Sequence, residues 1–327
     1  MPDRATAEAV RPERSRGIPR RKWMVRGGLA GLGAAAAAAY GVWPGFWHRY
    51  FSDMKRPILR PAAIPDPRLW PDRGLHTAWL GHATVLVKMD GFTFITDPQF
   101  SDRAGIALGP VTLGIKRLVA PALAIPDLPH IDLILLSHAH MDHFDLPSLR
   151  KLEGKRTDVV TPARTSDLFR AHKYRTVHEL RWNETARFGD VLVRAFEVNH
   201  WGARMRTDTY RGYNGYVVES GRYRVLFAGD TAETHLFRQL KSSKPYHLAM
   251  MPIGAYNPWI RYHCTPEQAW RMGNEAGAEF MLPMHHQTFA LGREPFLEPI
   301  QRFYDAAANA SNRVAVRRIG QEFKLSV

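Results

Sequence analysis

The chain of 327 residues is poor in cysteine and in acidic residues. Its single cysteine, Cys264, leaves no partner for an intramolecular disulfide, so a disulfide-stapled secreted scaffold is excluded. The 31 acidic residues are outnumbered by 45 lysines and arginines, which gives a formal net charge of +14. Such an excess favours an anionic partner, namely a phospholipid surface, a nucleic acid or a small phosphorylated or carboxylated substrate. A basic face without a partner is the alternative.

Low-complexity tracts, internal repeats and linkers are also missing from residues 75–327. With 45% hydrophobic and 11% aromatic residues, the chain has the material for a large core. We therefore expect one globular domain over residues 75–327. An extended arm is expected over residues 44–74, because five prolines fall within residues 56–74.

The first 43 residues have the composition of an export signal. Residues 1–26 contain eight basic and three acidic residues, which leaves 37 basic against 28 acidic residues, a net +9, for the rest. They lead through Arg20-Arg21-Lys22 into an uncharged Gly/Ala/Leu run with a small-residue cleavage site at Ala37-Ala38-Ala39. Paired arginines before a weakly hydrophobic run resemble a twin-arginine signal. We expect export through a bacterial inner membrane to the periplasm.

Two alternatives for this segment remain open. The apolar run reaches about 17 residues if it extends to Trp43, near the lower limit for a membrane span, so an uncleaved anchor facing the periplasm is possible. A basic tail with an alanine-rich helix is the other alternative. Aromatic residues that follow closely are expected either at a membrane interface or against the domain: Trp43, Phe46, Trp47, Tyr50 and Phe51.

Two β-hairpins are predicted from their turns. Asp90-Gly91 and Ser220-Gly221 are two-residue turn signals between apolar runs. The corresponding strands are residues 84–89 and 92–96, and residues 213–218 and 223–227. Residues 191–198 alternate apolar and polar side chains, as a half-buried strand does, and residues 131–136 are nearly all apolar, which predicts a strand buried on both faces.

Helices are predicted between the strands. Thr265-Pro266-Glu267-Gln268 has the pattern of a capping box with proline at the first helical position, and Gly277 ends that helix. Asp145 is expected to cap a helix over residues 146–152, and Ser166 a short helix reaching residue 171.

The last 35 residues are predicted to contain one more helix and two strands. Phe296, Ile300 and Phe303 recur at helical spacing and are expected to face the core. Residues 314–319 and 322–327 are expected to be strands. Strand pairs followed by helix–strand alternation, in two halves, predict an α/β fold of two mixed sheets packed together with helices outside, a four-layer αββα sandwich.

Three histidines and an aspartate follow the buried strand within six positions. They are His138, His140, Asp142 and His143. Because desolvating such a cluster is costly without a cation to bind the imidazole lone pairs, the cluster predicts a metal site. Alternate positions point together, so residues 138 and 140 can face one ion while residues 142 and 143 face another. Two ligands do not complete the coordination of either ion, so we expect further ligands later in the sequence.

Candidate ligands of that kind follow three later strands. His200 comes after residues 191–198, Asp230 after residues 223–227, and His285 after residues 280–284. Four further motifs accompany them: Trp79-Leu80-Gly81-His82-Ala83, Thr96-Asp97-Pro98, Asn199-His200-Trp201-Gly202 and His285-His286-Gln287-Thr288-Phe289. In this order the motifs resemble the metallo-β-lactamase-fold hydrolases over nearly all of residues 75–327. They look like the branch containing N-acylphosphatidylethanolamine phospholipase D.

This resemblance implies ligands for two zinc ions: His138, His140 and His200 for one, Asp142, His143 and His285 for the other, and Asp230 bridging both. Imidazole and carboxylate ligands without cysteine suit zinc, and manganese or iron could also occupy such a site. His285 is preferred to His286 because it holds the first position of the family's His-x-Gly-Thr-Phe segment. Cys264 is expected to be structural.

The resemblance also assigns roles around the ligands. Asp97 resembles the buried aspartate that orients the metal-binding loop, and His82 is expected to support the site structurally. His263 matches a histidine that lipid-cleaving members place near the substrate, with a local role beside the helix cap as the alternative. Tyr262 stands where those relatives often have glutamine.

The loops around the ligands also depart from the family pattern. Ala139 and Met141 stand where Asn and Tyr are usual, and Gln287 stands where glycine is usual. These departures leave the family's arrangement of ligands in place but change its surroundings, so the substrate is not fixed by the resemblance.

Two metals roughly 3.5–4 Å apart would lower the pKa of a bridging water toward about 7, so that hydroxide is available as the nucleophile and no side-chain nucleophile is needed. Asp142, Asp230 and His263 are then the candidate catalytic residues. The leading hypothesis is hydrolysis of an N-acylphosphatidylethanolamine-like phospholipid at a membrane.

Three alternatives are weighed against this hypothesis. One is hydrolysis of a small soluble ester or lactone, and a second is a non-catalytic membrane-surface protein with structural metals. Nuclease activity is weaker, because no arginine–aromatic module marks a nucleic-acid partner.

Overall fold

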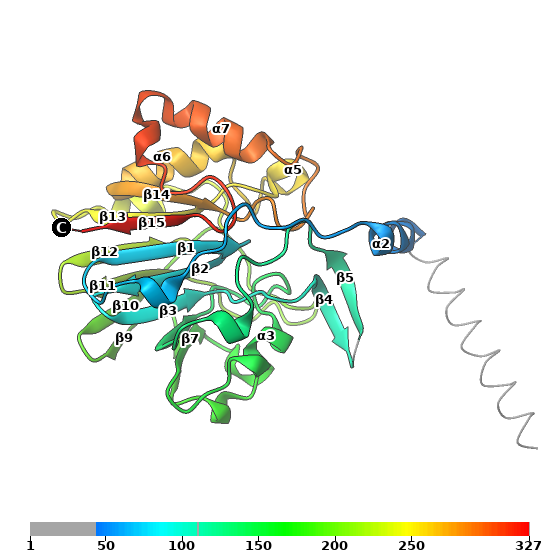
Figure 1. Ribbon diagram of the computed structural model, residues 1–327, viewed down its shortest axis with the longest axis horizontal. Helices are drawn as coiled ribbons and strands as arrows, with labels where there is room; N and C mark the ends of the chain where they lie inside the picture. The colour runs from blue at the N-terminus through cyan, green and yellow to red at the C-terminus, as the bar shows by residue number, and fades with distance from the viewer. Residues whose placement is uncertain (1–43, 110, 327) are drawn as a thin grey trace, which may run out of the picture. The chain divides into compact units, whose positions relative to one another are not determined.

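The computed structural model describes residues 44–109 and 111–326 (Figure 1). The predicted export signal and Trp43 lie outside these residues. Residues from Asp53 onward form one compact unit, and helix α2 (Pro44–Lys55) begins in the unit that precedes it. The rings of Trp47, Tyr50 and Phe51 on α2 lie against one another. In the described part of the chain, no helix is both long enough and apolar enough to span a bilayer.

Two large sheets make up the unit (Figure 1). The strands of the first sheet are, in spatial order, β15 (Glu322–Leu325), β1 (Leu75–Gly81), β2 (Thr84–Met89), β3 (Phe92–Thr96), β6 (Leu133–Leu135), β7 (Asp158–Pro162) and β8 (Val177–Leu180). Those of the second are β14 (Ala278–Met284), β13 (Tyr246–Pro252), β12 (Tyr223–Phe227), β11 (Gly215–Ser220), β10 (Val191–Phe196) and β9 (Thr185–Phe188). A separate ribbon pairs β4 (Arg103–Leu108) with β5 (Val111–Lys116).

Both sheets are mixed, and each changes from antiparallel to parallel pairing at one point. In the first sheet β1, β2 and β3 pair antiparallel, and β3, β6, β7 and β8 pair parallel. In the second sheet β9 to β12 pair antiparallel, and β12, β13 and β14 pair parallel. Both predicted hairpins are present. The first hairpin pairs Met89 with Phe92 across Asp90-Gly91, as predicted. In the second, Ser220 pairs with Tyr223, so the turn is Gly221-Arg222, one position later than predicted, and its first strand also begins and ends two positions later than predicted.

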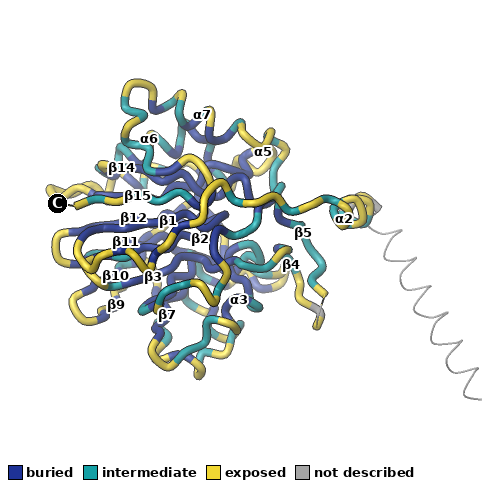
Figure 2. Tube along the Cα trace, in the orientation of Figure 1, coloured by how far each residue is buried: buried dark blue, intermediate teal, exposed yellow. Residues whose placement is uncertain are grey.

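The sheets pack face to face over one apolar core. This core takes Phe94 and Leu133 from the first sheet and Tyr216, Val225 and Leu248 from the second. All five side chains have no exposed surface. Figure 2 shows the strands buried along most of their length, with exposure concentrated in the turns.

Helices α6 (Pro266–Ala276) and α7 (Glu298–Ala307) cover the second sheet. Thr265 accepts the Gln268 N–H while the Gln268 side chain accepts the Thr265 N–H, and Gly277 ends α6 in the left-handed conformation, as predicted. Ala269, Met272 and Phe303 from these helices form a second apolar cluster against β12, β13 and β14. The predicted class of two mixed sheets with helices outside is confirmed.

The remaining helices are short. They are α3 (Leu146–Lys151), α4 (Leu236–Gln239), α5 (Tyr256–Trp259) and the 3-10 segments η1 (Pro67–Leu69), η2 (Ile125–Asp127), η3 (Ser166–Leu168), η4 (Ala171–Lys173) and η5 (Ala308–Arg313).

Two predicted helix caps are wrong. The Asp145 carboxylate accepts hydrogen bonds from the hydroxyls of Ser101 and Ser148 instead of capping α3. The helix expected after Ser166 is two 3-10 turns, because the Glu179 carboxylate, and not Ser166, receives the free N–H groups of the turn.

Two further predictions near the C-terminus are wrong. Phe296 precedes α7 and is 41% exposed, whereas Ile300 and Phe303 are buried as predicted. Residues 314–319 form no strand apart from a bridge between Val314 and Met281. Their backbone instead serves the N-terminal arm, since the Ile319 carbonyl accepts the N–H groups of residues 62 and 63.

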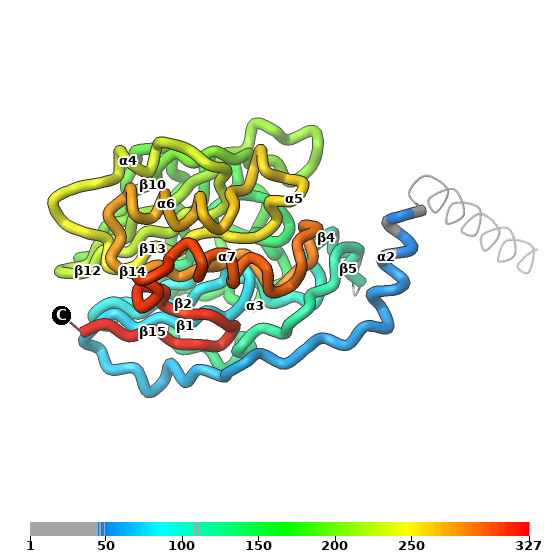
Figure 3. Tube along the Cα trace, turned by 90° about the horizontal axis from the view of Figure 1, so that it is seen from above, coloured from blue at the N-terminus to red at the C-terminus, as the bar shows by residue number. Residues whose placement is uncertain are grey.

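Of the arm predicted over residues 44–74, residues 44–55 form helix α2 instead of an extended segment. Residues 56–74 follow an irregular, mostly extended path along the domain (Figure 3). The backbone of Leu59 is hydrogen-bonded to residues 118 and 120, and the Trp70 indole donates to Glu322 on β15. At Gly320, which has φ +93°, a Cβ would lie 1.7 Å from the Ala63 carbonyl oxygen. The close contact between arm and domain therefore requires glycine at this position.

Candidate metal centre

The predicted ligands come from loops that follow four strands. Residues 138–143 follow β6, His200 follows β10, Asp230 follows β12 and His285 follows β14. Because β12 and β14 run in the same direction in one sheet and the sheets face each other, their carboxyl ends bring these loops together. Within the described residues, all seven side chains predicted as ligands belong to groups of His and Asp side chains whose ligand atoms lie within 4.8 Å of one another.

One group consists of His138, His140 and His200, whose ligand atoms all lie within 4.8 Å of one another. The Nδ1 atom of His140 is 2.8 Å from Nε2 of His138 and 3.3 Å from Nε2 of His200. Three imidazole nitrogens from two distant loops therefore converge on one centre.

The other group contains Asp142, His143 and His285. Nε2 of His143 is 3.1 Å from Nε2 of His285, and both nitrogens are 3.5 Å from Oδ2 of Asp142. His82 joins this group, since its Nε2 is 3.0 Å from the same carboxylate oxygen.

Asp230 lies between the two groups. Its Oδ2 is 3.0 Å from His143 Nε2 and 3.1 Å from His285 Nε2 on one side, and 3.9 Å from Nε2 of both His138 and His200 on the other. This is the place expected of a carboxylate that would bridge two cations.

The unpaired atoms of the cluster fit metal ions. Among the described residues neither oxygen of Asp230 makes a hydrogen bond of good geometry, although the residue is 2% exposed, and its contacts with the rings of His143 and His285 are ion pairs through Oδ2. A buried carboxylate without hydrogen bonds is unfavourable unless a cation neutralises it. Two nitrogens bound tetrahedrally to one ion at about 2.0–2.1 Å would lie about 3.4 Å apart. The distance is 3.1 Å between Nε2 of His143 and Nε2 of His285 in one group, and 3.3 Å between Nδ1 of His140 and Nε2 of His200 in the other.

Hydrogen bonds behind the cluster orient the imidazoles. Asp97 accepts the Nδ1–H of His143 at 2.7 Å and the N–H and hydroxyl of Ser137, which fixes Nε2 of His143 toward the centre. The Nδ1–H of His200 donates to the Tyr262 carbonyl at 2.8 Å, so its Nε2 keeps a free lone pair. Such partners fix ring orientation and tautomer in metal sites. Asp97 thus lies where the resemblance places it.

Burial and neighbouring charges shift the pKa values of the histidines in the cluster in opposite directions. Burial lowers the pKa of His138 and of His200 well below the ordinary value, so both rings are neutral at pH 7. Burial also opposes protonation of His143 and His285, but Asp230 and Asp142 outweigh it. They hold the pKa of His143 well above its usual range and raise that of His285 to about 9. Protons therefore occupy the place that a cation would take next to the carboxylates.

The choice between His285 and His286 is decided by where the two rings lie. His285 faces the cluster, whereas the His286 ring stacks on Trp79 with centroids 4.5 Å apart. Both nitrogens of His286 are buried without partners among the described residues, and burial lowers its pKa to about 3. His286 therefore packs behind the centre as a neutral ring.

Two contacts that support the loop of residues 138–143, called the metal loop below, were not predicted from the sequence. The Arg204 guanidinium donates to the carbonyls of Ala139 at 3.1 Å and Phe144 at 2.8 Å, so it ties both ends of the loop to one group. Gly229 has φ +60°, and a Cβ there would lie 2.8 Å from the Ser137 side chain. Glycine thus lets the Asp230 loop approach the metal loop. Neither contact joins residues that are close in the sequence.

An apolar groove of about 300 Å3 opens beside the cluster. Its outer wall carries Trp201, Trp259 and Tyr262, which are 39%, 50% and 42% exposed. His263 also lines it, with a buried and unpaired Nδ1 3.8 Å from Oδ2 of Asp230, and burial lowers the pKa of His263 to about 4. Cys264 beside it is buried and donates to the Pro252 carbonyl, as expected of a structural thiol.

Comparisons with known proteins agree with this geometry. The model of the beta-lactamase superfamily domain matches residues 93–286. An uncharacterized protein of Mycobacterium tuberculosis is 32% identical over 276 residues, which cover 80% of this chain and 73% of the relative. N-acyl-phosphatidylethanolamine-hydrolyzing phospholipase D 1 of Caenorhabditis elegans is 31% identical over 246 residues, which cover 70% of this chain and 68% of the relative.

A solved structure shows the same fold. The crystal structure of a metallo-beta-lactamase fold protein from Bacillus subtilis superposes with a TM-score of 0.53 at 12% identity, covering 77% of this chain and 100% of that chain.

Proposed function

Because this chain belongs to the metallo-β-lactamase superfamily of metal-dependent hydrolases, in the branch of the N-acylphosphatidylethanolamine-hydrolysing phospholipases D, we propose that it hydrolyses phosphodiester bonds of phospholipids. The preferred substrate in this proposal is an N-acylphosphatidylethanolamine-like lipid. The observation that carries it is the pair of ligand groups that share Asp230 and border an apolar, aromatic-walled groove.

Two zinc ions are the cofactors in this proposal. His138, His140 and His200 would hold one ion, and Asp142, His143 and His285 the other, with Asp230 between them. Nitrogen and carboxylate donors without a thiolate suit zinc, and manganese or iron accept the same donors. When bound, such ions supply a Lewis acid and lower the pKa of water to about 7.

The chain's own residues would position the substrate and handle protons. Asp230, whose oxygens have no hydrogen-bond partner among the described residues, would hold the proton of the attacking water and pass it to the leaving alkoxide. His263 is neutral at pH 7, and its unpaired Nδ1 lies beside the groove, where the ring can contact a phosphoryl oxygen. His82 keeps the Asp142 carboxylate in place. The oxygen of water joins phosphorus as the bond to the ethanolamine oxygen breaks.

The groove and the charge of the chain support a lipid substrate. Three partly exposed aromatic side chains beside the cluster suit acyl chains better than a small polar ester. The net charge of +14 favours an anionic phospholipid surface, so membrane association is part of the proposal. Export to the periplasm is proposed from the composition of residues 1–43. Cell fractionation of the full-length chain tests it, and retention in the cytoplasm would contradict it.

The experiment is turnover of N-acylphosphatidylethanolamine by the purified, zinc-loaded chain. Phosphatidic acid and N-acylethanolamine are the expected products, in equal amounts, and Asp230→Asn is expected to abolish their formation. Asp190→Asn, at an exposed position, is the matched control. If two zinc ions are bound and no phosphatidic acid forms while a soluble lactone or ester is hydrolysed, the lipid assignment is wrong.

A further inference from the structure

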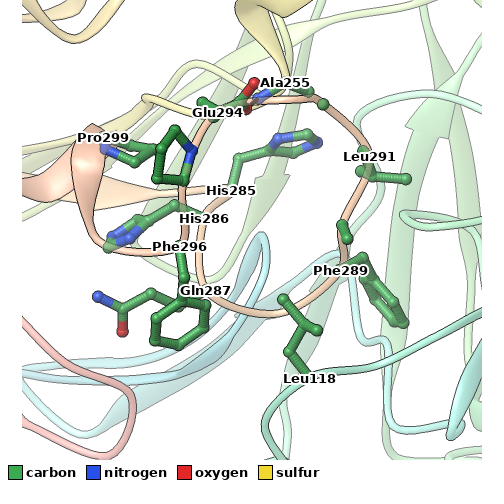
Figure 4. Close-up of a pocket in the computed structure, with 14 residues that line it drawn as sticks. Leu118, Ala255, His285, His286, Gln287, Phe289, Leu291, Glu294, Phe296 and Pro299 are labelled. Atoms are coloured by element: carbon green, nitrogen blue, oxygen red, sulfur yellow. Dashed lines mark hydrogen bonds between the residues drawn. The ribbon is translucent and has the colours of Figure 1, made fainter. Parts of the chain in front are cut away.

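A second chamber of about 170 Å3 lies next to the groove, and the proposed mechanism does not use it (Figure 4). Ala255 and Leu291 line both spaces, so the chamber and the groove adjoin along these two residues. His285, a candidate ligand, also lines the chamber. The chamber therefore borders the proposed metal centre, as the groove does.

Glu294 brings a carboxylate into this chamber. Its Oε1 accepts the N–H of Ala255, which lies in the left-handed conformation with φ +63°. The neighbouring Arg293 N–H donates to the Asn257 carbonyl at 2.7 Å, so two backbone contacts hold the segment. Figure 4 shows the Glu294 side chain next to Ala255, on the same side of the chamber as the His285 ring.

The other oxygen of Glu294 is free. Oε2 is buried and has no hydrogen-bond partner among the described residues. A Cβ on Gly292 would lie 2.1 Å from Oε2, so the glycine leaves the space that the oxygen occupies. A buried carboxylate oxygen without a partner is unfavourable until a donor reaches it. The described lining residues offer no cationic side chain near it apart from histidines.

We propose that this chamber binds the nitrogen-bearing head group of the substrate and that Glu294 determines specificity by accepting its N–H group. The inference rests on the proposed phosphodiester hydrolysis and deepens it, because it assigns the nitrogen of the leaving-group arm to the chamber and the glycerol-bound acyl chains to the groove. Both an ammonium and a secondary amide present the required N–H, whereas a quaternary ammonium does not.

Head-group binding tests the proposal without catalysis. Phosphoethanolamine, N-acetylphosphoethanolamine and phosphocholine are titrated into the zinc-loaded full chain by calorimetry. The wild-type chain is expected to bind at least one of the two N–H compounds about 10-fold or more tightly than phosphocholine, as a hydrogen bond to a charged acceptor implies. Preference for the first identifies an ammonium, and preference for the second identifies an amide.

Glu294→Gln is the main variant. Its amide oxygen can still accept the Ala255 N–H, so the NH2 group takes the place of Oε2 and presents a donor where the substrate needs an acceptor. The preference over phosphocholine is expected to fall to within about twofold. Glu279→Gln, at an exposed position on β14, is the matched control and should keep the preference.

Gly292→Ala is the second variant, because it keeps the charge but displaces Oε2. It should lose the preference as Glu294→Gln does, with a thermal midpoint confirming that each variant is folded. The proposal is overturned if the wild-type chain shows no preference, or if both variants keep it. A preference that depends on Glu294 in a chain that hydrolyses no phosphodiester would leave this inference standing and reject the proposed function.

Discussion

Asp230 shows most clearly what the cluster is built to hold. A carboxylate that is 2% exposed, has no hydrogen bond among the described residues and lies 3.0 to 3.9 Å from four imidazole nitrogens is stable only if positive charge is supplied. Protons on His143 and His285 meet part of that need in the metal-free chain, as their raised pKa values indicate. Metal binding would replace these protons.

Asp97 orients a candidate ligand without being one itself, so its replacement tests how much the orientation of the ligand contributes to metal binding. In Asp97→Asn one oxygen becomes an NH2 group, which cannot accept the Nδ1–H of His143, so the ring loses its fixed orientation. We expect zinc affinity to fall about 10- to 100-fold while the fold is retained. Competition with a chromophoric chelator measures the affinity. An unchanged affinity, equal to that of the exposed control Asp190→Asn, would show that Asp97 does not orient the ligand.

The ligand residues could be predicted from the sequence because their spacing and their places after strands are local signals. Their binding of metals stays a prediction until ions are measured. Arg204 and Glu294 could not be predicted, because each acts through contacts with distant segments. Arg204 reaches the metal loop about 60 positions earlier, and Glu294 reaches Ala255 39 positions earlier. A single arginine or glutamate in a loop carries no pattern that marks such a contact.

At the scale of elements, the metal loop is held from both sides. Arg204 bonds to the carbonyls of Ala139 and Phe144, on either side of three of the four candidate ligands in this loop. The loop that contains Arg204 also carries Asp208 and Arg211, which pair with each other, and Arg211 pairs in addition with Asp167. The metal loop is therefore hydrogen-bonded to the Arg204 loop, which is itself held by these ion pairs.

Arg204→Ala is expected to loosen this support. Loss of two hydrogen bonds from a charged donor to buried carbonyls should lower the free energy of unfolding by about 2 kcal/mol and speed zinc release. Denaturant unfolding and stopped-flow chelation measure the two effects. Arg206→Ala, two positions away and exposed, is the matched control. Equal zinc release from both variants would argue against a positioning role for Arg204.

The turn after β7 has its own support, in Glu179. Its carboxylate accepts the N–H groups of Arg164, Thr165 and Ser166 at 2.8 to 3.0 Å. Burial opposes the charge, but these hydrogen bonds outweigh it and lower the pKa of Glu179. A carboxyl group with a lowered pKa stabilises the fold above its unfolded pKa of about 4.3, and this stability is lost as pH falls through the folded value.

Glu179→Gln should therefore destabilise the chain in a pH-dependent way. We expect a loss of about 1 kcal/mol at pH 7, comparable to the loss of a helix cap, and convergence with the wild-type chain as pH falls below about 4. Thermal unfolding at several pH values measures this. A constant difference from pH 7 to pH 3 would contradict the assignment, and Glu197→Gln at an exposed position is the control.

Elements with short-range signals were predicted well. The hairpin at Asp90-Gly91 and the capping box at Thr265 are encoded by neighbouring residues, and both are present with the predicted bounds or nearly so. Residues 314–319 were wrongly predicted as a strand, because an apolar alternating pattern does not reveal that the backbone bonds to residues 62 and 63 instead. The same reason explains the wrong cap at Asp145, whose carboxylate is used by Ser101.

At the scale of the whole molecule, the two sheets repeat one plan. Each begins with antiparallel strands and ends with parallel ones, so the loops after β3, β6, β12 and β14 gather at one edge of the core. The apolar strands on either side form the rigid base on which His138, Asp230 and His285 are held. The fold class followed from the order of strand pairs and helices, and the family from the motifs at the strand ends.

We infer that this edge of the two sheets holds two metal ions between side chains from distant strands. The most direct measurement is the metal content of the purified, zinc-saturated full-length chain and of His140→Ala, by elemental analysis, together with turnover of N-acylphosphatidylethanolamine. We expect two ions per wild-type chain, and in the variant a lower metal content with turnover reduced at least 100-fold, as loss of a catalytic metal implies. A wild-type chain with fewer than two ions, or a variant with unchanged turnover, would contradict it.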